Sequence, residues 1–318
     1  MVTASGARRV RVRASGRRGS YPARLVLPTA GLWRLTARAG GTTSRLGSVR
    51  VRRAPAKPLL FTQPTSIDLE PSGTLLLVEN NPGRVLRVNP GTGRVSVLVP
   101  TLFRPYAIVR GASGSVYISI GNALQRLNGS GTPTTVAEVP LGIEIGPIAA
   151  APNGDVYYST ATQIFRLPGG SGPSVHIAGT GAEGGAGDGG PALDAQFSSP
   201  HGLAVAADGS LLVSDRGNDR VRRIDPLTGV ITAFAPVGEP YGSDVAPDGT
   251  VYVVDGKQSR VARVSPSGSI LGYAGPAFAV AYDLEVASDG VVYLLQAGPT
   301  GRIRRIAPDG SVTTVSRR

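Results

Sequence analysis

The sequence contains no cysteine and only two histidines, His176 and His201, among its 318 residues. Disulfide bonds and thiolate metal sites are therefore excluded, and so is any site that needs three histidines. No apolar run approaches the roughly 18 residues of a membrane-spanning helix. The residues that follow Met1 also lack the apolar core of a signal peptide. We therefore expect a chain with no membrane span.

Acidic residues are absent from residues 1–57, which carry 14 of the 33 arginines and lysines. The remaining 19 basic residues are matched by 21 acidic ones, so the formal charge of +12 belongs to the N-terminal segment alone. Its arginines are spread along strand-like sequence, and no recognition helix accompanies them. We therefore predict no nucleic-acid partner.

Residues 1–53 alternate between polar and apolar side chains as β-strands do. The run YPARLVLPTAGLWRLTARAGG (Tyr21–Gly41) resembles the late strands of a bacterial immunoglobulin-like sandwich, where a Pro-x-x-Gly turn precedes a strand with a tryptophan, here Trp33. Only about half of the seven strands of such a sandwich are present. The resemblance implies a partial Ig-like β domain at residues 1–53, with further strands at 23–27 and 46–51, and residues 54–58 are expected to be a linker.

From Leu59 onward the chain repeats with a period of about 40 residues, which is typical of propeller blades. The repeats align on a turn glycine, with spacings of 41, 40, 55, 40 and 41 residues: Gly73, Gly114, Gly154, Gly209, Gly249 and Gly290. Each copy has room for four short strands. The sequence therefore predicts an all-β fold, a six-bladed β-propeller of four-stranded antiparallel blades at residues 59–318. Leu59–Thr62 is a candidate for an outer or extra strand where the ring closes.

The expected third strand of every copy carries an arginine before an aliphatic residue: Arg87, Arg126, Arg166, Arg223, Arg263 and Arg305. We expect each stem to cover the neighbouring blade and each guanidinium to bind polar groups near the end of the second strand, such as Asp215 and Asp255. These arginines are thus predicted to be structural.

The copy PHGLAVAADGSLLVSDRGNDRVRRID (Pro200–Asp225) resembles the NHL repeat almost throughout. The preceding IAGTGAEGGAGDGGPALDAQF (Ile177–Phe197) looks like the glycine-rich insertion of bacterial NHL proteins. We expect this insertion to pack against blades 3 and 4. The resemblance implies a six-bladed propeller but does not fix a function.

Two enzyme families are similar in fold. The gluconolactonase-like family binds a divalent cation near the channel with Glu, Asn and Asp side chains. Virginiamycin B lyase resembles the segments YGSDVAPDGTVYVVD and GRIRRIAPDGSVTTV, but it needs a histidine as general acid and base. Copies 5 and 6 of this chain contain no histidine, so the lyase reaction lacks its catalytic group.

Acidic residues occupy one inner-strand register in copies 1, 5 and 6, which are consecutive in a closed ring. Across the six copies this register reads Asp68, Val109, Ala149, Ala204, Asp244 and Glu285, with Asp283 nearby. Three converging carboxylates would suit a hard cation such as calcium or magnesium. Alternatively, each carboxylate caps turn amides or pairs with Arg110 on the adjacent blade. Both interpretations stay open at this point.

A second register, at the expected channel mouth, gathers aromatic residues. It reads Thr65, Tyr106, Gly146, His201, Tyr241 and Tyr282. Tyrosine and histidine at one rim offer large contact area at low entropic cost, which suits a protein or carbohydrate ligand. The alternative is packing between neighbouring loops.

The sequence therefore favours a non-catalytic binding propeller that recognises a protein or glycan through Tyr106, His201, Tyr241 and Tyr282. We expect a monomer outside the cytoplasm or at the cell envelope, with no catalytic residue and no certain cofactor. The alternative is a metal-dependent, lactonase-like hydrolase with a divalent cation on Asp68, Asp244 and Glu285.

Overall fold

The computed structural model describes residues 2–5, 9–12, 31–39, 42–51, 57–127, 131–297 and 301–317. The chain forms two compact units, residues 1–57 and 58–318, and each is considered by itself.

The N-terminal unit forms one antiparallel sheet in its described residues. The strand order is β2-β1-β3-β4, with β1 at Val2–Ser5, β2 at Arg9–Val12, β3 at Gly31–Ala39 and β4 at Thr42–Val51. The strand expected at residues 23–27 lies outside the described residues. A single described sheet is not a sandwich, so the Ig-like fragment stays a prediction.

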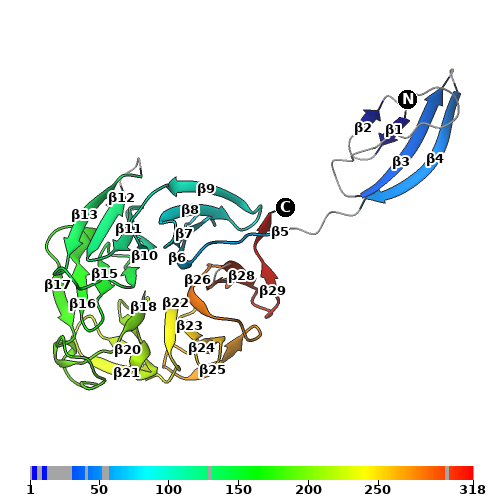
Figure 1. The fold of residues 1–318 in the computed structure, drawn as a ribbon. Helices are drawn as coiled ribbons and strands as arrows, with labels where there is room; N and C mark the ends of the chain where they lie inside the picture. The colour runs from blue at the N-terminus through cyan, green and yellow to red at the C-terminus, as the bar shows by residue number, and fades with distance from the viewer. Residues whose placement is uncertain are drawn as a thin grey trace. The chain divides into compact units, whose positions relative to one another are not determined.

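The second unit is a ring of six four-stranded antiparallel sheets, which confirms the predicted propeller (Figure 1). Blade 1 comprises β6 (Pro64–Leu69), β7 (Leu75–Glu79), β8 (Arg84–Asn89) and β9 (Arg94–Val99). Blade 2 comprises β10 (Pro105–Arg110), β11 (Val116–Ile120), β12 (Ala123–Leu127) and β13 (Pro133–Glu138). Blade 3 comprises β14 (Ile148–Ala150), β15 (Val156–Ser159), β16 (Ile164–Leu167) and β17 (Val175–Ala178).

Blade 4 comprises β18 (Pro200–Val205), β19 (Leu211–Asp215), β20 (Arg220–Ile224) and β21 (Ile231–Ala235). Blade 5 comprises β22 (Pro240–Val245), β23 (Val251–Asp255), β24 (Arg260–Val264) and β25 (Ile270–Ala274). Blade 6 comprises β26 (Ala281–Val286), β27 (Val292–Gln296), β28 (Arg302–Ile306) and β29 (Val312–Thr314). Short 3-10 turns occur at η1 (Pro168–Gly170), η2 (Ala192–Asp194) and η3 (Arg216–Asn218). In the described part of the chain, no helix has the length and apolarity to cross a membrane.

Packing between blades explains why each second strand is apolar on both of its faces. Alternate side chains of a strand point to opposite faces of its sheet. In β7, Leu75 and Leu77 pack with residues of blade 6, whereas Leu76 and Val78 pack with residues of blade 2. All five residues of β7 are buried. Similar clusters join the other neighbouring blades, so the hydrophobic core is a ring of interblade layers.

The chain that enters the propeller closes the ring on the last blade. Leu59 donates its backbone N–H to the carbonyl of Val315 at 3.1 Å. Phe61 and Gly301 exchange backbone hydrogen bonds of 2.9 and 2.7 Å beside the start of β28. The outer edge of blade 6 is thus shared by β29 and by residues 59–61, and β5 (Lys57–Pro58) pairs with β30 (Ser316–Arg317). This pairing leaves fewer free backbone groups at the seam.

The repeated arginines of the third strands are bound at the start of the second strand, not at its end. Arg87 pairs with Glu70 at 3.1 Å and Arg166 with Asp155 at 3.5 Å, and Arg223 pairs with Asp208. The prediction that Asp215 and Asp255 receive these guanidinium groups was therefore wrong. The antiparallel register places the third-strand arginine opposite the second residue of the second strand, for example Arg223 opposite Leu212, so its side chain reaches the acidic residues of the preceding turn.

Candidate functional site

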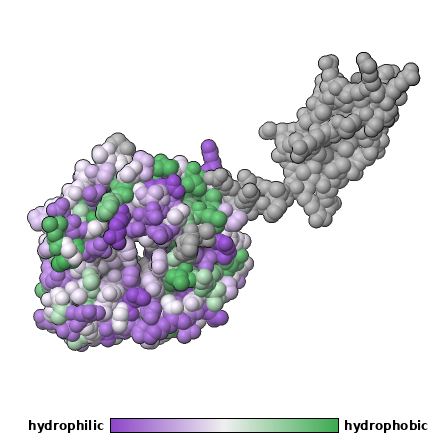
Figure 2. Space-filling model, in the orientation of Figure 1, coloured by the Kyte–Doolittle hydropathy of each residue, from purple (hydrophilic) through white to green (hydrophobic). Residues whose placement is uncertain are grey.

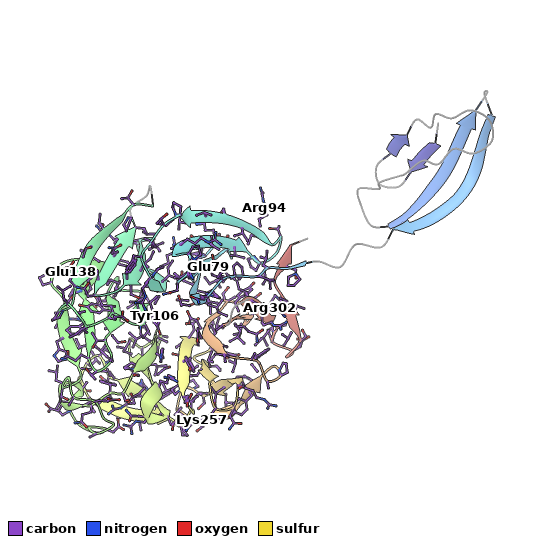
Figure 3. The ribbon with its side chains drawn as sticks, viewed as in Figure 1. Glu79, Arg94, Tyr106, Glu138, Lys257 and Arg302 are labelled. Carbon is purple, nitrogen blue, oxygen red and sulfur yellow. The ribbon has the colours of Figure 1, made fainter. Side chains whose placement is uncertain are left out.

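The rim residues follow a repeated backbone irregularity at the start of the inner strands. The residue before the first proline has a positive φ in four blades, at Gln63, Arg104, Ser199 and Glu239, with values of 45°, 50°, 50° and 42°. The pairing of inner and second strand then shifts by a bulge across Thr65, Tyr106, His201, Tyr241 and Tyr282. A bulged residue is unpaired and its side chain is re-aimed relative to the sheet. This device presents each rim side chain at the channel mouth, and Figure 3 shows Tyr106 close to the centre of the ring.

The structure brings the four predicted rim residues together. The hydroxyl of Tyr106 lies 2.7 Å from Nδ1 of His201. The His201 ring centroid is 5.1 Å from that of Tyr241, which is 5.6 Å from that of Tyr282. Side chains from blades 2, 4, 5 and 6 therefore form one continuous series of ring contacts, which we call the aromatic rim.

Two members of the rim, Tyr106 and His201, are uncharged at neutral pH. Burial, with a smaller contribution from Asp283, raises the pKa of Tyr106 above its ordinary value. Burial and the nearby Arg216 guanidinium lower the pKa of His201 to about 4. At neutral pH the imidazole is therefore uncharged and the phenol keeps its proton, which suits a hydrogen bond from Tyr106 to His201.

Arg216, which the sequence analysis did not identify, lies against the aromatic rim. It lies in η3, and its guanidinium carbon is 4.9 Å from the Tyr241 ring centroid. Its Nη2 is 3.6 Å from Oε2 of Glu239, so the charge is paired at the surface. The sequence held no signal for this contact, because nothing in it placed the η3 turn over the ring of the next blade.

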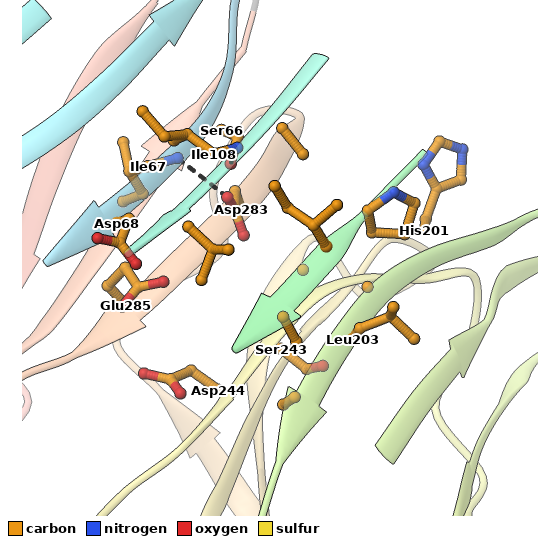
Figure 4. A pocket seen from close by; sticks show the side chains of 18 of the residues that line it. Ser66, Ile67, Asp68, Ile108, His201, Leu203, Ser243, Asp244, Asp283 and Glu285 are labelled. Carbon is orange, nitrogen blue, oxygen red and sulfur yellow. Dashed lines mark hydrogen bonds between the residues drawn. The ribbon is translucent and has the colours of Figure 1, made fainter. Parts of the chain in front are cut away.

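Below the rim, the acidic residues of blades 5, 6 and 1 accept backbone amides from the following blade. Asp244 Oδ2 accepts from Val286 at 2.8 Å, Asp283 Oδ2 from Ile67 at 3.0 Å, and Asp68 Oδ1 from Arg110 at 3.2 Å. Glu285 is bonded by the backbone amide of Leu69. The carboxyl groups therefore link neighbouring inner strands through strand amides, not through the turn amides of the sequence-based alternative. Figure 4 shows the four groups around the same stretch of channel.

Burial in the channel, with a smaller contribution from neighbouring carboxyl groups at Asp68, Asp283 and Glu285, makes ionisation unfavourable. Burial raises the pKa of Asp68 to about 7, that of Asp244 to about 6 and that of Asp283 to about 7. Burial also raises the pKa of Glu285 well above its ordinary value, and the charges of Asp244, Asp68 and Asp283 add to the effect. Like charges that share one site oppose each other's ionisation.

The carboxyl groups do not fit a metal ion. Among the described residues, no group of three or more His, Asp or Glu side chains is arranged to hold one. A divalent cation needs several oxygen atoms converging at ~2.0–2.6 Å. Asp244 and Asp283 instead direct both of their oxygens to backbone amides. Asp68, Asp244 and Glu285 thus share a channel without forming a converging ligand set.

One cavity of about 510 Å³ contains both the aromatic rim and the carboxyl groups. Its wall on blades 5, 6 and 1 carries the acids, whereas its wall on blades 2 to 4 carries Val109, Ala149 and Ala204. A second hollow of about 240 Å³ adjoins the rim at Tyr106 and His201. The space-filling view shows the ring hollowed at its centre (Figure 2). A volume of this size suits a small molecule or part of a larger partner.

The glycine-rich insertion, residues 179–197, is anchored as part of the scaffold. Ala192, Ala195 and Phe197 are buried in the core between blades 3 and 4. The fully buried Arg222 donates to Asp188 at 2.9 Å and to the carbonyl groups of Gln196 and Ala186 at 2.6 and 3.0 Å. The Arg222 guanidinium therefore has all of these hydrogen-bond partners within the protein, which indicates that the insertion has a structural role.

Comparison with known proteins identifies one sequence repeat in this chain and structures with the same fold as its propeller. Residues 197–224 match the model of the NHL repeat. No curated protein matches the chain. Among solved structures, the gluconolactonase XC5397 from Xanthomonas campestris is 18% identical with a TM-score of 0.65, and the match covers 82% of this chain and 100% of that one.

Two further structures are similar to the propeller. Virginiamycin B lyase from Staphylococcus aureus is 16% identical with a TM-score of 0.62, covering 83% of this chain and 89% of that chain. The calcium-binding protein regucalcin from Agrobacterium tumefaciens is 15% identical with a TM-score of 0.61, covering 82% and 93%. Identities this low indicate the shared six-bladed fold and no specific activity.

Proposed function

We propose that this propeller is a non-catalytic binding protein that holds a protein or glycan partner at the aromatic rim. The observation that carries the proposal is the unbroken series of ring contacts from Tyr106 through His201 and Tyr241 to Tyr282 at the mouth of a cavity. Tyrosine rings provide a large contact area while few rotatable bonds are fixed on binding.

The surroundings of the rim also favour a partner of some size. Tyr282 is 39% exposed at the mouth. The loops that lead into β10 and β14 carry Phe103 and Leu141, which are 81% and 90% exposed. Exposed apolar side chains on loops that enter the inner strands offer contact area to a partner.

The hydrolase alternative finds less support. It needs a cation on Asp68, Asp244 and Glu285, and these residues provide no converging ligands. The partial Ig-like domain at residues 1–53 fits the binding proposal as a spacer in a modular protein outside the cytoplasm. Its support is the resemblance of Tyr21–Gly41 and the adjoining four-stranded sheet.

The test compares the wild-type protein with a Tyr241→Ala/Tyr282→Ala variant on a glycan array and against a displayed peptide library. We expect the wild type to select a ligand and the double variant to lose at least about tenfold in affinity, as removal of central aromatic contacts does. Tyr273→Ala is the matched control, because Tyr273 lies on the outer strand β25 of blade 5, away from the rim. Equal binding by the double variant and the wild type would reject this surface.

A further inference from the structure

The acidic half of the channel has acceptor capacity that the protein itself does not use. Asp68 is only 7% exposed, and its Oδ2 is buried with no hydrogen-bond partner. Thr65 Oγ1, on the same blade and lining the same cavity, is also buried without a partner. An unpaired buried carboxylate oxygen is costly, so this position favours a hydrogen-bond donor from a ligand.

Among the described residues that line the cavity, Arg110 lowers the pKa of Asp68, but its charge does not outweigh the effect of burial. The two guanidinium groups of the cavity belong to Arg216 and Arg110. Arg216 is committed to Tyr241 and Glu239 at the rim. The Arg110 guanidinium lies beside the Gly114 turn, at the end of β10 opposite the rim. Four carboxyl groups therefore face an opposite wall of Val109, Ala149 and Ala204, which has no donor side chain.

We propose that the acidic half of the channel receives the ammonium group of an organic ligand whose body lies against the aromatic rim. An ammonium group offers three donors at hydrogen-bond distance, so it does not need the tight convergence of oxygens that a metal ion requires. Aromatic faces next to it add cation–π attraction. The apolar wall of blades 2 to 4 would contact the carbon skeleton. This inference rests on the proposed function, since the rim and the channel form one site.

The probe is phenethylammonium, with 2-phenylethanol and phenylacetate as matched neutral and anionic controls. Each is titrated calorimetrically into the whole protein at pH 8 in an amine-free buffer. We expect the ammonium compound to bind roughly tenfold or more tightly than the alcohol, and the carboxylate to give no heat. A short peptide with one lysine, against the same peptide with norleucine, distinguishes a free amine from an amine on a polypeptide.

Substitutions in the channel test whether the ammonium group binds at the carboxyl groups. In Asp68→Asn/Glu285→Gln the affinity for phenethylammonium should fall by about tenfold. Asp248→Asn, which removes one charge from an exposed turn, should change it by less than about twofold. If the double variant does not fold, titration of the wild type at pH 6, where Asp68 and Asp283 are mostly protonated, in two buffers of different ionisation enthalpy replaces it. Binding of the cation must then release protons, because the carboxyl groups ionise to receive it.

Three results would overturn the inference: equal affinity for the ammonium compound and the alcohol, no effect of the double variant, or no proton release. In a separate experiment, the melting temperature of the protein is measured with calcium chloride or magnesium chloride alone. A rise in melting temperature with either salt and none with phenethylammonium would make the cluster a metal site instead. The partner assay with Tyr241→Ala/Tyr282→Ala is independent of these results. If it shows loss of a ligand while the amine series fails, the binding function stands and only the ammonium assignment falls.

Discussion

Two regions of the propeller bury charged side chains, and they do so in opposite ways. Beneath the glycine-rich insertion, Arg222 is surrounded by Asp188, Asp215 and carbonyl oxygens. In the channel, four carboxyl groups from three consecutive blades share one cavity. The first region neutralises itself and closes the contact between blades 3 and 4. The second gathers one sign of charge, so its neutralisation depends on protons or on a ligand.

The largest expected effect on stability comes from breaking the ion pairs of Arg222 beneath the glycine-rich insertion. Arg222→Met would remove the cation that Asp188 and Asp215 share, leaving Asp188 its pair with Arg220 and the fully buried Asp215 without a paired charge. The change should lower the free energy of unfolding by about 3 kcal/mol. Urea unfolding measures this change. Arg223→Met is a matched control on the next residue, because the Arg223 side chain is 34% exposed in its pair with Asp208. The control should lose less than about 1 kcal/mol. Similar losses in the two variants would contradict the distinction between the two arginines.

The second prediction concerns the channel, where removing a charged group should raise the stability of the protein instead of lowering it. Because burial raises the pKa of Asp68 from 3.8 to about 7, the folded protein retains a proton that the unfolded chain releases between those values. The wild-type protein should therefore lose stability as the pH rises from about 4 to 7. Asp244 and Glu70 strengthen this shift and Arg110 opposes it, while Glu285 titrates in the same cluster.

Asp68→Asn tests this linkage. Asparagine keeps an oxygen that accepts the Arg110 amide but carries no charge. We expect the variant to be more stable than the wild type by about 1–3 kcal/mol at pH 8 and to show little difference at pH 4. Chemical unfolding at both pH values measures it, with Asp248→Asn as the exposed control. A gain of equal size at pH 4 and pH 8 would show that packing, and not charge, is responsible.

The contrast also explains how much of the molecule could be predicted. The blades followed from the spacing of turn glycines such as Gly209 and Gly249, because each repeat needs the same tight turn between its first two strands. The rim residues could be aligned for the same reason. Their mutual contacts could not be derived, because a bulge at the start of each inner strand changes which side chains face the channel.

Polar partners across blades were the least predictable feature. The alignment selected Arg223 as the repeated arginine, yet the neighbouring Arg222 is the fully buried one. Its partners Asp188 and Gln196 belong to an insertion that occurs once, so no repeat could indicate them. The acids of the channel were found by register, but their amide partners, such as Val286 for Asp244, depend on how closely neighbouring inner strands approach.

The smallest expected effect lies where the two kinds of charge meet, at the rim. Arg216 is one cause of the low pKa of His201, and burial is the larger one. Arg216→Gln should therefore raise that pKa from about 4 only part of the way to 6.5, as followed by NMR titration of the imidazole protons. Because a lowered histidine pKa removes stability as the pH falls from about 6.5 to 4, the variant should also lose less stability on acidification. Arg260→Gln, which removes a guanidinium from the Tyr273 ring on the same blade as Tyr241, should leave the His201 titration unchanged. An unchanged titration in Arg216→Gln as well would mean that burial alone keeps the His201 imidazole neutral.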